Sequence, residues 1–413
     1  MYKEICECRV CKSKELELIL DLGIQSLTGV FPSSVGQKVS NGPIELVRCS
    51  SKDGCGLVQL KQSYDMSEMY GLNYGYRSGL NSLMVQHLHS KVDKIIDLGI
   101  LEDGDLILDI GSNDATTLRA YPLGHYKLVG IDPTGVKYSG YYPPDISLIS
   151  DFFSKDAIRR SLGDVQAKII TSFSMFYDLE DPVNFAIEVE SVLHNDGIWI
   201  LEQSYLPSML KTNSFDTICH EHLEFYALKQ IMWIMNNAGL RVKDVEFNNI
   251  NGGSFSIEVV KKKSNHASNT QRINEILKNE QLLGLEDGSA FKDFRERVVQ
   301  AREVLLGFLK ESKKDGKTVV GLGASTKGNV LLQYFNITSE LLPVIGEINT
   351  DKFQCFTPGT LIPMASEDEV LASNPDYILV LPWHFREYFV KSKKMSGKKL
   401  VFPLPVLEIV HVD

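Results

Sequence analysis

The feature that most constrains the fold is the alternation of helical and strand-like segments in two separate series. In the first series, apolar runs alternate with helical patterns such as 82–98, and the runs lie at 106–110, 127–131, 167–171 and 198–201. The second series has its runs at 318–322, 341–345 and 376–381. Alternation of this kind is typical of mostly parallel sheets covered by helices. The pattern therefore predicts an α/β protein with two Rossmann-like domains.

The length of the chain and a charged connector indicate how these series are divided. A chain of 413 residues is too long for one ordinary hydrophobic core. A charged helical stretch at about 268–312 separates the two series. We predict domains at 1–75, 76–262 and 263–413. Ligands commonly bind between domains, so we expect a cleft between the two α/β domains.

Cysteine is concentrated at the start of the chain, where Cys8 and Cys11 form a CxxC pair and Cys49 and Cys55 supply a second pair. Two thiolate pairs suit a tetrahedral structural zinc site that stabilises a small module. The second pair has a wider spacing than the roughly two intervening residues of a standard zinc ribbon. Free or redox-active thiols are the alternative. Cys6 is left as the spare cysteine.

The charge and the apolar pattern limit the possible partners. A net charge of −10 disfavours non-specific binding to nucleic acid or to an anionic membrane. No apolar run approaches the roughly 20 residues that span a bilayer, and the N-terminus lacks the apolar core of a signal peptide. We expect a cytoplasmic, monomeric protein that binds a small molecule, with no nucleic-acid or membrane partner.

A polar turn follows the first strand of the first series and contains Asp109, Gly111 and Asn113, while Asp132 ends the next strand. An acidic residue at the second position commonly accepts hydrogen bonds from ribose hydroxyls. A dinucleotide fingerprint would need G-x-G-x-x-G, whereas this turn has one glycine and is acidic. It would repel a pyrophosphate but suits the cationic donor S-adenosylmethionine. We therefore favour S-adenosylmethionine over a dinucleotide.

Two further residues are candidates for the same ligand. Asp151 and Phe152 follow the next strand-like segment, where an acid and an aromatic ring could hold an adenine. An ordinary helix start with core phenylalanines explains the same residues equally well.

A second glycine-rich loop at 321–329 again joins a strand to a helix and contains Ser325, Lys327 and Asn329. Backbone amides at a helix N-terminus favour anions, so this loop is a candidate phosphate site. Glu347 lies at the end of the next strand. The loop also resembles a degenerate dinucleotide loop, and a glycine turn needed only for close packing is a third interpretation.

The stretch 217–226 places His220, Glu221 and His222 side by side in a chain with nine histidines. Imidazoles take and give protons near neutral pH, and a neighbouring carboxylate fixes their tautomer and basicity. The cluster is a candidate general base, although a surface pair or a metal-ligand pair would look the same.

Taken in order, these motifs resemble those of the nucleotide-sugar C-methyltransferases of deoxysugar pathways. The resemblance covers essentially the whole chain. It rests on Cys8–Cys11, Asp21–Gly23, Cys55–Leu60, Tyr74–Gly79, Asp109–Asp114, Glu221–Tyr226, Asn251–Ser254, Gly323–Asn329, Thr357–Gly359 and Leu381–Trp383. It implies an N-terminal zinc module, a class I methyltransferase domain and a C-terminal Rossmann-like domain.

The resemblance also implies a reaction, which is transfer of a methyl group from S-adenosylmethionine to C3 of a nucleotide-linked 4-keto deoxysugar. At the family's base position, His222 would take the C3 proton, and Glu221 and His220 would orient or polarise the site. The implied sugar contacts are Tyr76 and Tyr226. The implied contacts with the nucleotide diphosphate are Ser325, Lys327, Asn329 and Glu347.

The chain departs from the family pattern at Cys219, where members usually have a tyrosine, and at Ala115, where glycine is usual. The first change removes a hydroxyl from the implied catalytic cluster. Three alternatives remain open at this point. They are a sugar O-methyltransferase, an NAD(P)-dependent oxidoreductase that uses the second loop, and a non-enzymatic zinc-ribbon binding protein.

Overall fold

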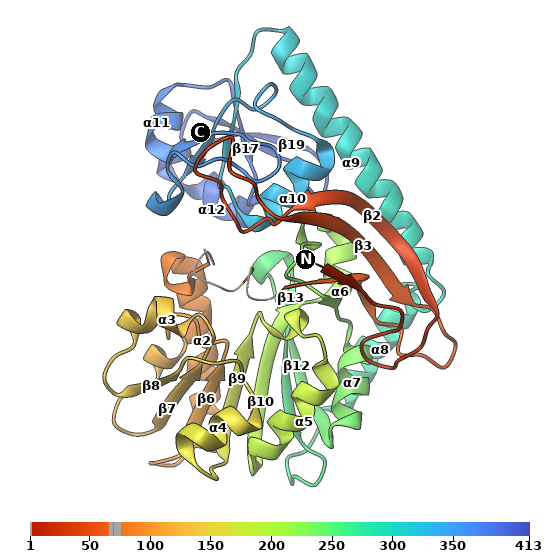
Figure 1. Ribbon diagram of the computed structural model, residues 1–413, viewed down its shortest axis with the longest axis vertical. Coiled ribbons are helices and arrows are strands. Elements are labelled where there is room, and N and C mark those ends of the chain that lie inside the picture. The colour runs from red at the N-terminus through yellow and green to blue at the C-terminus, as the bar shows by residue number, and fades with distance from the viewer. Residues whose placement is uncertain (1, 66–68, 70–75) are drawn as a thin grey trace.

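The computed structural model describes residues 2–65, 69 and 76–413. Figure 1 shows a lower α/β body, an upper α/β body, and two elements that run along one side of both. These two elements are the long helix α9 (Ser289–Lys314) and the strand pair β2–β3. The predicted boundary at residue 75 falls in the segment 70–75, which lies outside the described residues. None of the helices in the described part is long and apolar enough to cross a bilayer.

The lower body is built on a seven-stranded sheet with the order β12-β13-β10-β9-β6-β7-β8. Its strands are β6 (Leu106–Ile110), β7 (Lys127–Ile131), β8 (Ile146–Ile149), β9 (Ala167–Phe173), β10 (Leu193–Ser204), β12 (Leu240–Asn248) and β13 (Ser254–Lys261). All neighbours are parallel except β13, which is antiparallel to both β10 and β12. The predicted strands at 106–110 and 127–131 are confirmed at the same residues.

Helices cover this sheet on both faces (Figure 1). They are α2 (Ser82–Asp97), α3 (Gly135–Tyr138), α4 (Lys155–Leu162), α5 (Pro182–Val192), α7 (Leu228–Asn237) and α8 (Thr270–Leu282). The short helix α6 (Leu206–Lys211) lies beyond the sheet and packs on α9. The stretch that we expected to be one connector is two helices, because α8 ends before α9 begins. The helix α8 packs on α7 and β12, and its Glu280 accepts a hydrogen bond from the Leu228 amide at the start of α7 (2.7 Å). By packing, α8 therefore belongs with the lower body.

The upper body has a six-stranded sheet with the order β16-β15-β14-β17-β18-β19. Its elements are β14 (Val319–Leu322), α10 (Thr326–Phe335), β15 (Ile345–Glu347), β16 (Met364–Ser366), α11 (Glu367–Ala372), β17 (Tyr377–Val380), α12 (Arg386–Lys391), β18 (Lys399–Phe402) and β19 (Glu408–His411). The strand predicted at 341–345 is wrong for most of its length, since β15 starts only at Ile345. Pro343 in that run has no amide hydrogen to donate to a neighbouring strand.

The N-terminal segment does not form a separate body. It contributes β1 (Tyr2–Glu4), β2 (Leu16–Ser26), β3 (Asn41–Cys49), β4 (Val58–Leu60) and β5 (Gln62–Tyr64). A four-stranded sheet has the order β11-β4-β3-β2, and β11 (Glu224–Phe225) comes from the lower body. The residues directly after the His-Glu-His cluster therefore complete the N-terminal sheet, which fixes that cluster against the N-terminal segment.

Four cysteine side chains converge at the base of this sheet. The Sγ atoms of Cys8, Cys11, Cys49 and Cys55 all lie within 4.8 Å of one another. Tetrahedral zinc with Zn–S bonds of about 2.3 Å would place its sulfur ligands about 3.8 Å apart, so the four thiols fit zinc. The wide spacing of the second pair is accommodated because Gly54 packs on Cys49, where a Cβ would come within 2.6 Å of Sγ.

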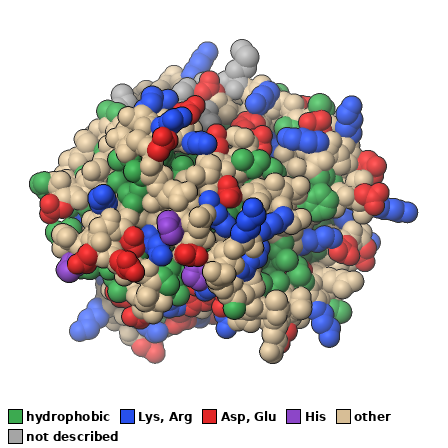
Figure 2. Space-filling model, turned by 90° about the horizontal axis from the view of Figure 1, so that it is seen from below, with side chains coloured by type: hydrophobic (Ala, Val, Ile, Leu, Met, Phe, Trp, Pro, Cys, Tyr) green, Lys and Arg blue, Asp and Glu red, His purple; other side chains and the backbone are tan. Residues whose placement is uncertain are grey.

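The face seen from below in Figure 2 carries acidic and basic side chains interspersed. This face therefore shows no broad basic patch of the kind that binds a nucleic-acid backbone.

Loss of one thiolate should release the zinc. We expect Cys55→Ser to lower bound zinc far below one ion per chain, and to destabilise the protein by about 3 kcal/mol or more because metal binding stabilises the folded module. Elemental analysis and thermal unfolding measure both effects. Cys6→Ser is the matched control, since Cys6 is exposed and lies outside the cluster. A zinc-free Cys55→Ser protein with unchanged stability would contradict the structural role.

Candidate active site

A cavity of about 310 Å³ lies at the carboxyl ends of β6, β7 and β9. We call it the donor cavity. Its lining includes Asp109, Gly111, Asn113, Asp132 and Phe152, which were all predicted to bind the cofactor. This is the edge of an open parallel sheet at which ligands bind.

The turn after β6 is shaped for close approach of a ligand. Gly111 has a φ of 74°, and a Cβ at this position would lie 3.2 Å from the Met175 side chain. The Asn113 amide donates a hydrogen bond to Asp132 Oδ2 (2.8 Å), and the Thr134 amide donates to Oδ1 (2.6 Å). The Asp132 carboxylate is thus held in place between the two loops.

The charge of the donor cavity identifies the kind of ligand that it suits. Asp109, Asp132 and Asp178 line it, and no lysine, arginine or histidine occurs among the described lining residues. Burial raises the pKa of Asp109 to about 7, although a hydrogen bond from Thr171 Oγ1 (2.6 Å) opposes this rise. A pyrophosphate would be repelled by this cavity. A sulfonium cation would be attracted, so the donor set fits S-adenosylmethionine.

The structure separates the two residues that we considered for the adenine. Phe152 is 46% exposed and lines the donor cavity. Asp151 is not part of the described lining, and its Oδ2 accepts a hydrogen bond from Arg160 (3.1 Å). The expectation for Asp151 is therefore corrected, because its carboxylate pairs with a neighbouring helix instead of facing the ligand site.

Tyr76 lies on the boundary between the donor cavity and a second cavity. The Asn113 side chain holds the backbone of residues 76–78 in place. It donates a hydrogen bond to the Tyr76 carbonyl (3.3 Å) and accepts one from the Ser78 amide (3.0 Å). Asp114 adds a hydrogen bond from the Gly79 amide (3.1 Å). The side chains of the donor loop therefore position the residues that separate the two cavities.

The second cavity also has a volume of about 310 Å³, and we call it the acceptor cavity. Residues from the N-terminal segment, the lower body and the upper body all line it. It shares four lining residues with the donor cavity, namely Tyr76, Met84, Ser174 and Asp178. A group bound in one cavity therefore lies next to a group bound in the other.

His222 lines the acceptor cavity in a defined tautomer. Its Nδ1 lies 2.7 Å from the Thr217 carbonyl oxygen, which can only accept, so Nδ1 carries the proton and Nε2 has a free lone pair. Tyr177 packs on the ring with a centroid distance of 4.4 Å. Burial lowers the pKa of His222 to about 4, which keeps the imidazole neutral at physiological pH. This geometry suits a proton acceptor.

Glu221 also lines the acceptor cavity, and burial raises the pKa of its carboxyl group. The neighbouring Cys219 is fully buried and lies outside the cavity. Burial and then the charge of Glu221 raise the pKa of the Cys219 thiol well above its ordinary value. The thiol is therefore neutral and fills space in the core.

His220 does not reach the acceptor cavity. It is fully buried, its Nε2 donates a hydrogen bond to the Gln25 carbonyl (3.1 Å), and its ring packs edge-on against Tyr64. The expectation that His220 orients or polarises the reacting groups is corrected. The chain turns at residues 220–221, so the side chains of His220 and His222 point in different directions and only His222 of the pair lines the cavity.

The second glycine-rich loop contributes Ser325 and Lys327 to the acceptor cavity. Ser325 is the N-cap of α10, where its Oγ accepts a hydrogen bond from the Gly328 amide (3.1 Å). Lys327 Nζ donates to the Asn251 carbonyl (2.9 Å), and burial lowers its pKa. The loop therefore brings a cation and a helix N-terminus to the cavity.

Three other predicted substrate contacts lie outside the acceptor cavity. Asn329 is fully buried and donates to the Thr28 carbonyl (2.8 Å). Glu347 accepts hydrogen bonds from the Ile348 amide (2.8 Å) and the Asn349 amide (3.1 Å) in its own loop. Tyr226 is 1% exposed and packs against Phe176 in the core. These expectations are corrected, since each side chain holds the fold around the cavity.

Two residues of the upper body that line the acceptor cavity, His384 and Lys352, were not predicted from the sequence. Burial lowers the pKa of His384 well below its ordinary value, so its ring is neutral. His384 follows Trp383, whose indole donates a hydrogen bond to the buried Asp216 (2.7 Å). This bond joins the loop of His384 to the segment that leads to His222. The Leu381–Trp383 motif was the available signal for His384, whereas Lys352 belongs to no recognised motif.

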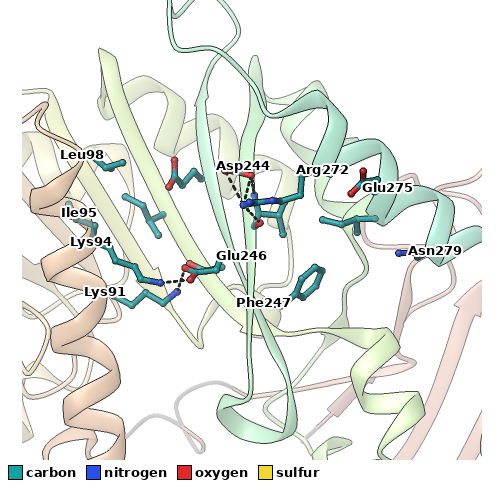
Figure 3. Close-up of a pocket in the computed structure, with 15 residues that line it drawn as sticks. Lys91, Lys94, Ile95, Leu98, Asp244, Glu246, Phe247, Arg272, Glu275 and Asn279 are labelled. Carbon is teal, nitrogen blue, oxygen red and sulfur yellow. Dashed lines mark hydrogen bonds and ion pairs between the residues drawn. The ribbon is translucent and has the colours of Figure 1, made fainter.

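A groove of about 650 Å³ between α2, β12 and α8 is unrelated to these cavities. Figure 3 shows that Lys91 and Lys94 point toward Glu246, and Arg272 toward Asp244. The Lys91–Glu246 and Arg272–Asp244 ion pairs measure 3.3 Å and 3.2 Å. Because these charges pair with one another, we assign no catalytic role to the described residues of the groove.

Comparison with family models gives three matches that follow one another along the chain. Residues 8–70 match a zinc-binding domain, residues 84–245 a methyltransferase domain, and residues 249–405 a C-methyltransferase C-terminal domain. The zinc-binding match contains the four clustered cysteines, and the methyltransferase match contains the donor cavity's loops. Together they confirm the predicted S-adenosylmethionine and zinc.

Individual proteins are similar over different lengths. The C-methyltransferase NovU of Streptomyces niveus is 27% identical over 100% of this chain and 98% of its own length. A chain in the complex of the Haloferax volcanii Trm112 methyltransferase activator with a methyltransferase is 16% identical, covers 43% of this chain and 91% of its own, and has a TM-score of 0.35. Magnesium protoporphyrin IX methyltransferase from Synechocystis is 13% identical, with coverages of 44% and 88% and a TM-score of 0.32.

The raised pKa of Asp109 predicts pH-dependent binding of the donor. With a pKa of about 7, this carboxyl is mostly protonated at pH 6 and mostly ionised at pH 8. Its attraction for a sulfonium should therefore be lost as the pH falls. We expect the Kd for S-adenosylmethionine, measured by titration calorimetry, to be about tenfold higher at pH 6 than at pH 8.

Asp109→Asn is the control for this experiment, because it cannot ionise. It should bind the donor weakly at both pH values and remove the pH dependence. An equally steep pH dependence in Asp109→Asn would show that another group, or the ligand itself, is responsible.

Proposed function

Because the chain belongs to the C-methyltransferases that join a zinc-binding domain, a methyltransferase domain and a C-methyltransferase C-terminal domain, we propose that it methylates a carbon beside the ketone of a nucleotide-linked 4-keto deoxysugar. The target carbon is C3. The observation that carries the proposal is the contact between two cavities of different chemistry. One is lined by carboxylates without a cation among its described residues, and the other brings the neutral imidazole of His222 together with Lys327 and Lys352.

The donor cavity binds the cofactor through its acidic groups. When bound, S-adenosylmethionine supplies an electrophilic methyl group on a positively charged sulfur. Asp109 and Asp132 attract and orient this cation, while Gly111 allows its close approach to the backbone. The shared residues Tyr76 and Ser174 place the donor beside the acceptor, and this alignment supplies much of the rate.

His222 acts as the general base. Its Nε2 takes the proton from the carbon beside the ketone, and the electron pair of the C–H bond becomes the enolate of the sugar. The Thr217 carbonyl holds the ring through Nδ1, so the orientation of Nε2 is fixed before the substrate binds. The neutral state at physiological pH leaves the lone pair available.

Lys327 and Glu221 assist from opposite domains. The ammonium of Lys327 is partly buried and stabilises negative charge that develops on the ketone oxygen. Glu221 lines the acceptor cavity, where its carboxyl group can accept a hydrogen bond from a sugar hydroxyl. Tyr76 lines both cavities and is placed to contact the sugar near the transferred methyl.

The diphosphate of the substrate is held at the start of α10. Amide groups at a helix N-terminus bind anions, and Ser325 is the N-cap of this ten-residue helix. Asn329 and Glu347 support this loop without contacting the ligand.

Replacing His222 should abolish methyl transfer without weakening the binding of S-adenosylmethionine. We expect His222→Gln to lower kcat by at least about 100-fold, because the base is lost, with an unchanged Kd for S-adenosylmethionine. Turnover is measured with ¹³C-methyl-labelled donor and a panel of nucleotide-linked 4-keto deoxysugars. NMR of the product distinguishes a methyl group on carbon from one on oxygen.

His125→Gln is the matched control, since His125 is exposed and pairs with Asp103 far from both cavities. It should retain wild-type turnover. Wild-type turnover of His222→Gln would remove His222 from the role of base. Parallel loss of donor binding would make it a structural residue, and a methyl group on oxygen would contradict the proposed reaction.

A further inference from the structure

A small cavity of about 10 Å³ adjoins the acceptor cavity at His222. We call it the inner cavity. It shares three lining residues with the acceptor cavity, namely Tyr177, Ser204 and His222. His222 therefore borders both spaces, one of which receives the substrate in the proposed function. A volume of this size has room for about one water molecule.

The inner cavity is lined by polar atoms that lack a partner. Both carboxyl oxygens of Glu224 and the hydroxyl of Thr217 are buried and make no hydrogen bond with any described residue. The Glu224 side chain has no exposed surface, and Thr217 is 2% exposed. Leaving a buried carboxyl or hydroxyl group without a partner is costly, so such groups commonly bind an internal water molecule.

Thr217 connects the inner cavity to the base. Its carbonyl oxygen accepts the hydrogen bond from His222 Nδ1 (2.7 Å), while its side chain belongs to the lining of the inner cavity. The orientation of the imidazole therefore depends on the position of one peptide group. The hydroxyl of the same residue is available to fix that position.

Glu224 is held by the zinc module. Arg9 lies in the CxxC knuckle of that module and is 3% exposed, and its Nε lies 3.6 Å from Glu224 Oε1. Its guanidinium also donates hydrogen bonds to the Leu60 carbonyl (2.5 Å) and the Ser63 hydroxyl (2.7 Å). The backbone of Glu224 pairs with Gln59 of β4. Both the side chain and the backbone of Glu224 are thus fixed against the N-terminal segment.

We propose that the inner cavity is a water site, and that its water joins the Glu224 carboxyl group to the Thr217 hydroxyl. The water steadies the peptide that orients His222, so Glu224 and Thr217 are positioning residues for the base. The zinc knuckle takes part because it supplies Arg9, which holds Glu224. This inference rests on the role of His222 in the proposed function.

A crystal structure of the full chain with S-adenosylhomocysteine, at a resolution that shows ordered water, tests the site directly. We expect one water within hydrogen-bond distance of Thr217 Oγ1 and of a Glu224 carboxyl oxygen. A dry cavity, or a direct hydrogen bond between the two side chains, would overturn the water site. This measurement does not depend on turnover of any sugar.

Substitution of Thr217 tests the positioning role. Thr217→Val keeps the branched shape and removes the hydroxyl. We expect it to lower kcat about tenfold, because the peptide that orients the base loses a hydrogen bond. The KM for the nucleotide-linked sugar and the Kd for S-adenosylmethionine should stay unchanged. Thr217→Ser keeps the hydroxyl and should restore wild-type kcat. Lower stability of Thr217→Val with wild-type kcat would overturn the positioning role.

Substitution of Glu224 examines the other end of the water bridge. Glu224→Gln keeps hydrogen-bonding atoms in the same shape and should retain most of the turnover, whereas Glu224→Met should lower kcat as Thr217→Val does. Thr212→Val is the matched control, because Thr212 donates to the Ser208 carbonyl (2.8 Å) and lies outside the lining of both cavities. It should keep wild-type kcat. Wild-type kcat in Glu224→Met would overturn the bridge.

The outcomes for the water site and for the proposed function differ. Wild-type kcat in Thr217→Val, together with an inactive His222→Gln, would overturn the positioning role and leave the proposed function standing. Wild-type turnover of His222→Gln would overturn the role of base and with it the positioning role, while the crystal structure would still show whether water fills the inner cavity.

Discussion

The loop of residues 25–32 is the constraint on which the acceptor site depends, because buried side chains hold it from both sides. From the lower body, His220 donates to the Gln25 carbonyl (3.1 Å). From the upper body, Asn329 donates to the Thr28 carbonyl (2.8 Å), and Gln333 accepts from the Ser26 amide (2.7 Å). A backbone polar group buried without a partner costs about 1–3 kcal/mol, so these bonds fix the relative positions of three chain segments.

This arrangement explains why the two ligand cavities differ so strongly. The donor cavity belongs to a single α/β sheet and is lined by carboxylates, which suits a cation. The acceptor cavity lies where the loop, the His222 segment and the start of α10 meet, and Lys327 and Lys352 line it together with the carboxyl groups of Asp178 and Glu221. Because the cavities share lining residues, a cationic donor and an anionic acceptor are held side by side without competing for one site.

The sequence predicted the structure correctly where a local pattern of residues decides it. The apolar runs at 106–110 and 127–131 became buried strands, and the four cysteines met as their pairing indicated. The sequence did not predict which way a side chain faces, because packing between distant segments decides this. His220 and Asn329 are of the chemical types that functional sites use, yet both bind backbone carbonyls of the loop. Lys352 was missed because it reaches the site only through the packing of the upper body on that loop.

The central claim is that the acceptor cavity removes a proton from carbon, and hydrogen–deuterium exchange tests it most directly. The protein would be incubated in D₂O with S-adenosylhomocysteine and a nucleotide-linked 4-keto deoxysugar, and the hydrogens beside the ketone followed by NMR. The account predicts protein-dependent replacement of one C3 hydrogen by deuterium, with none in His222→Gln. Retention of that hydrogen in the wild-type protein, over a time in which the same protein methylates the sugar, would contradict it.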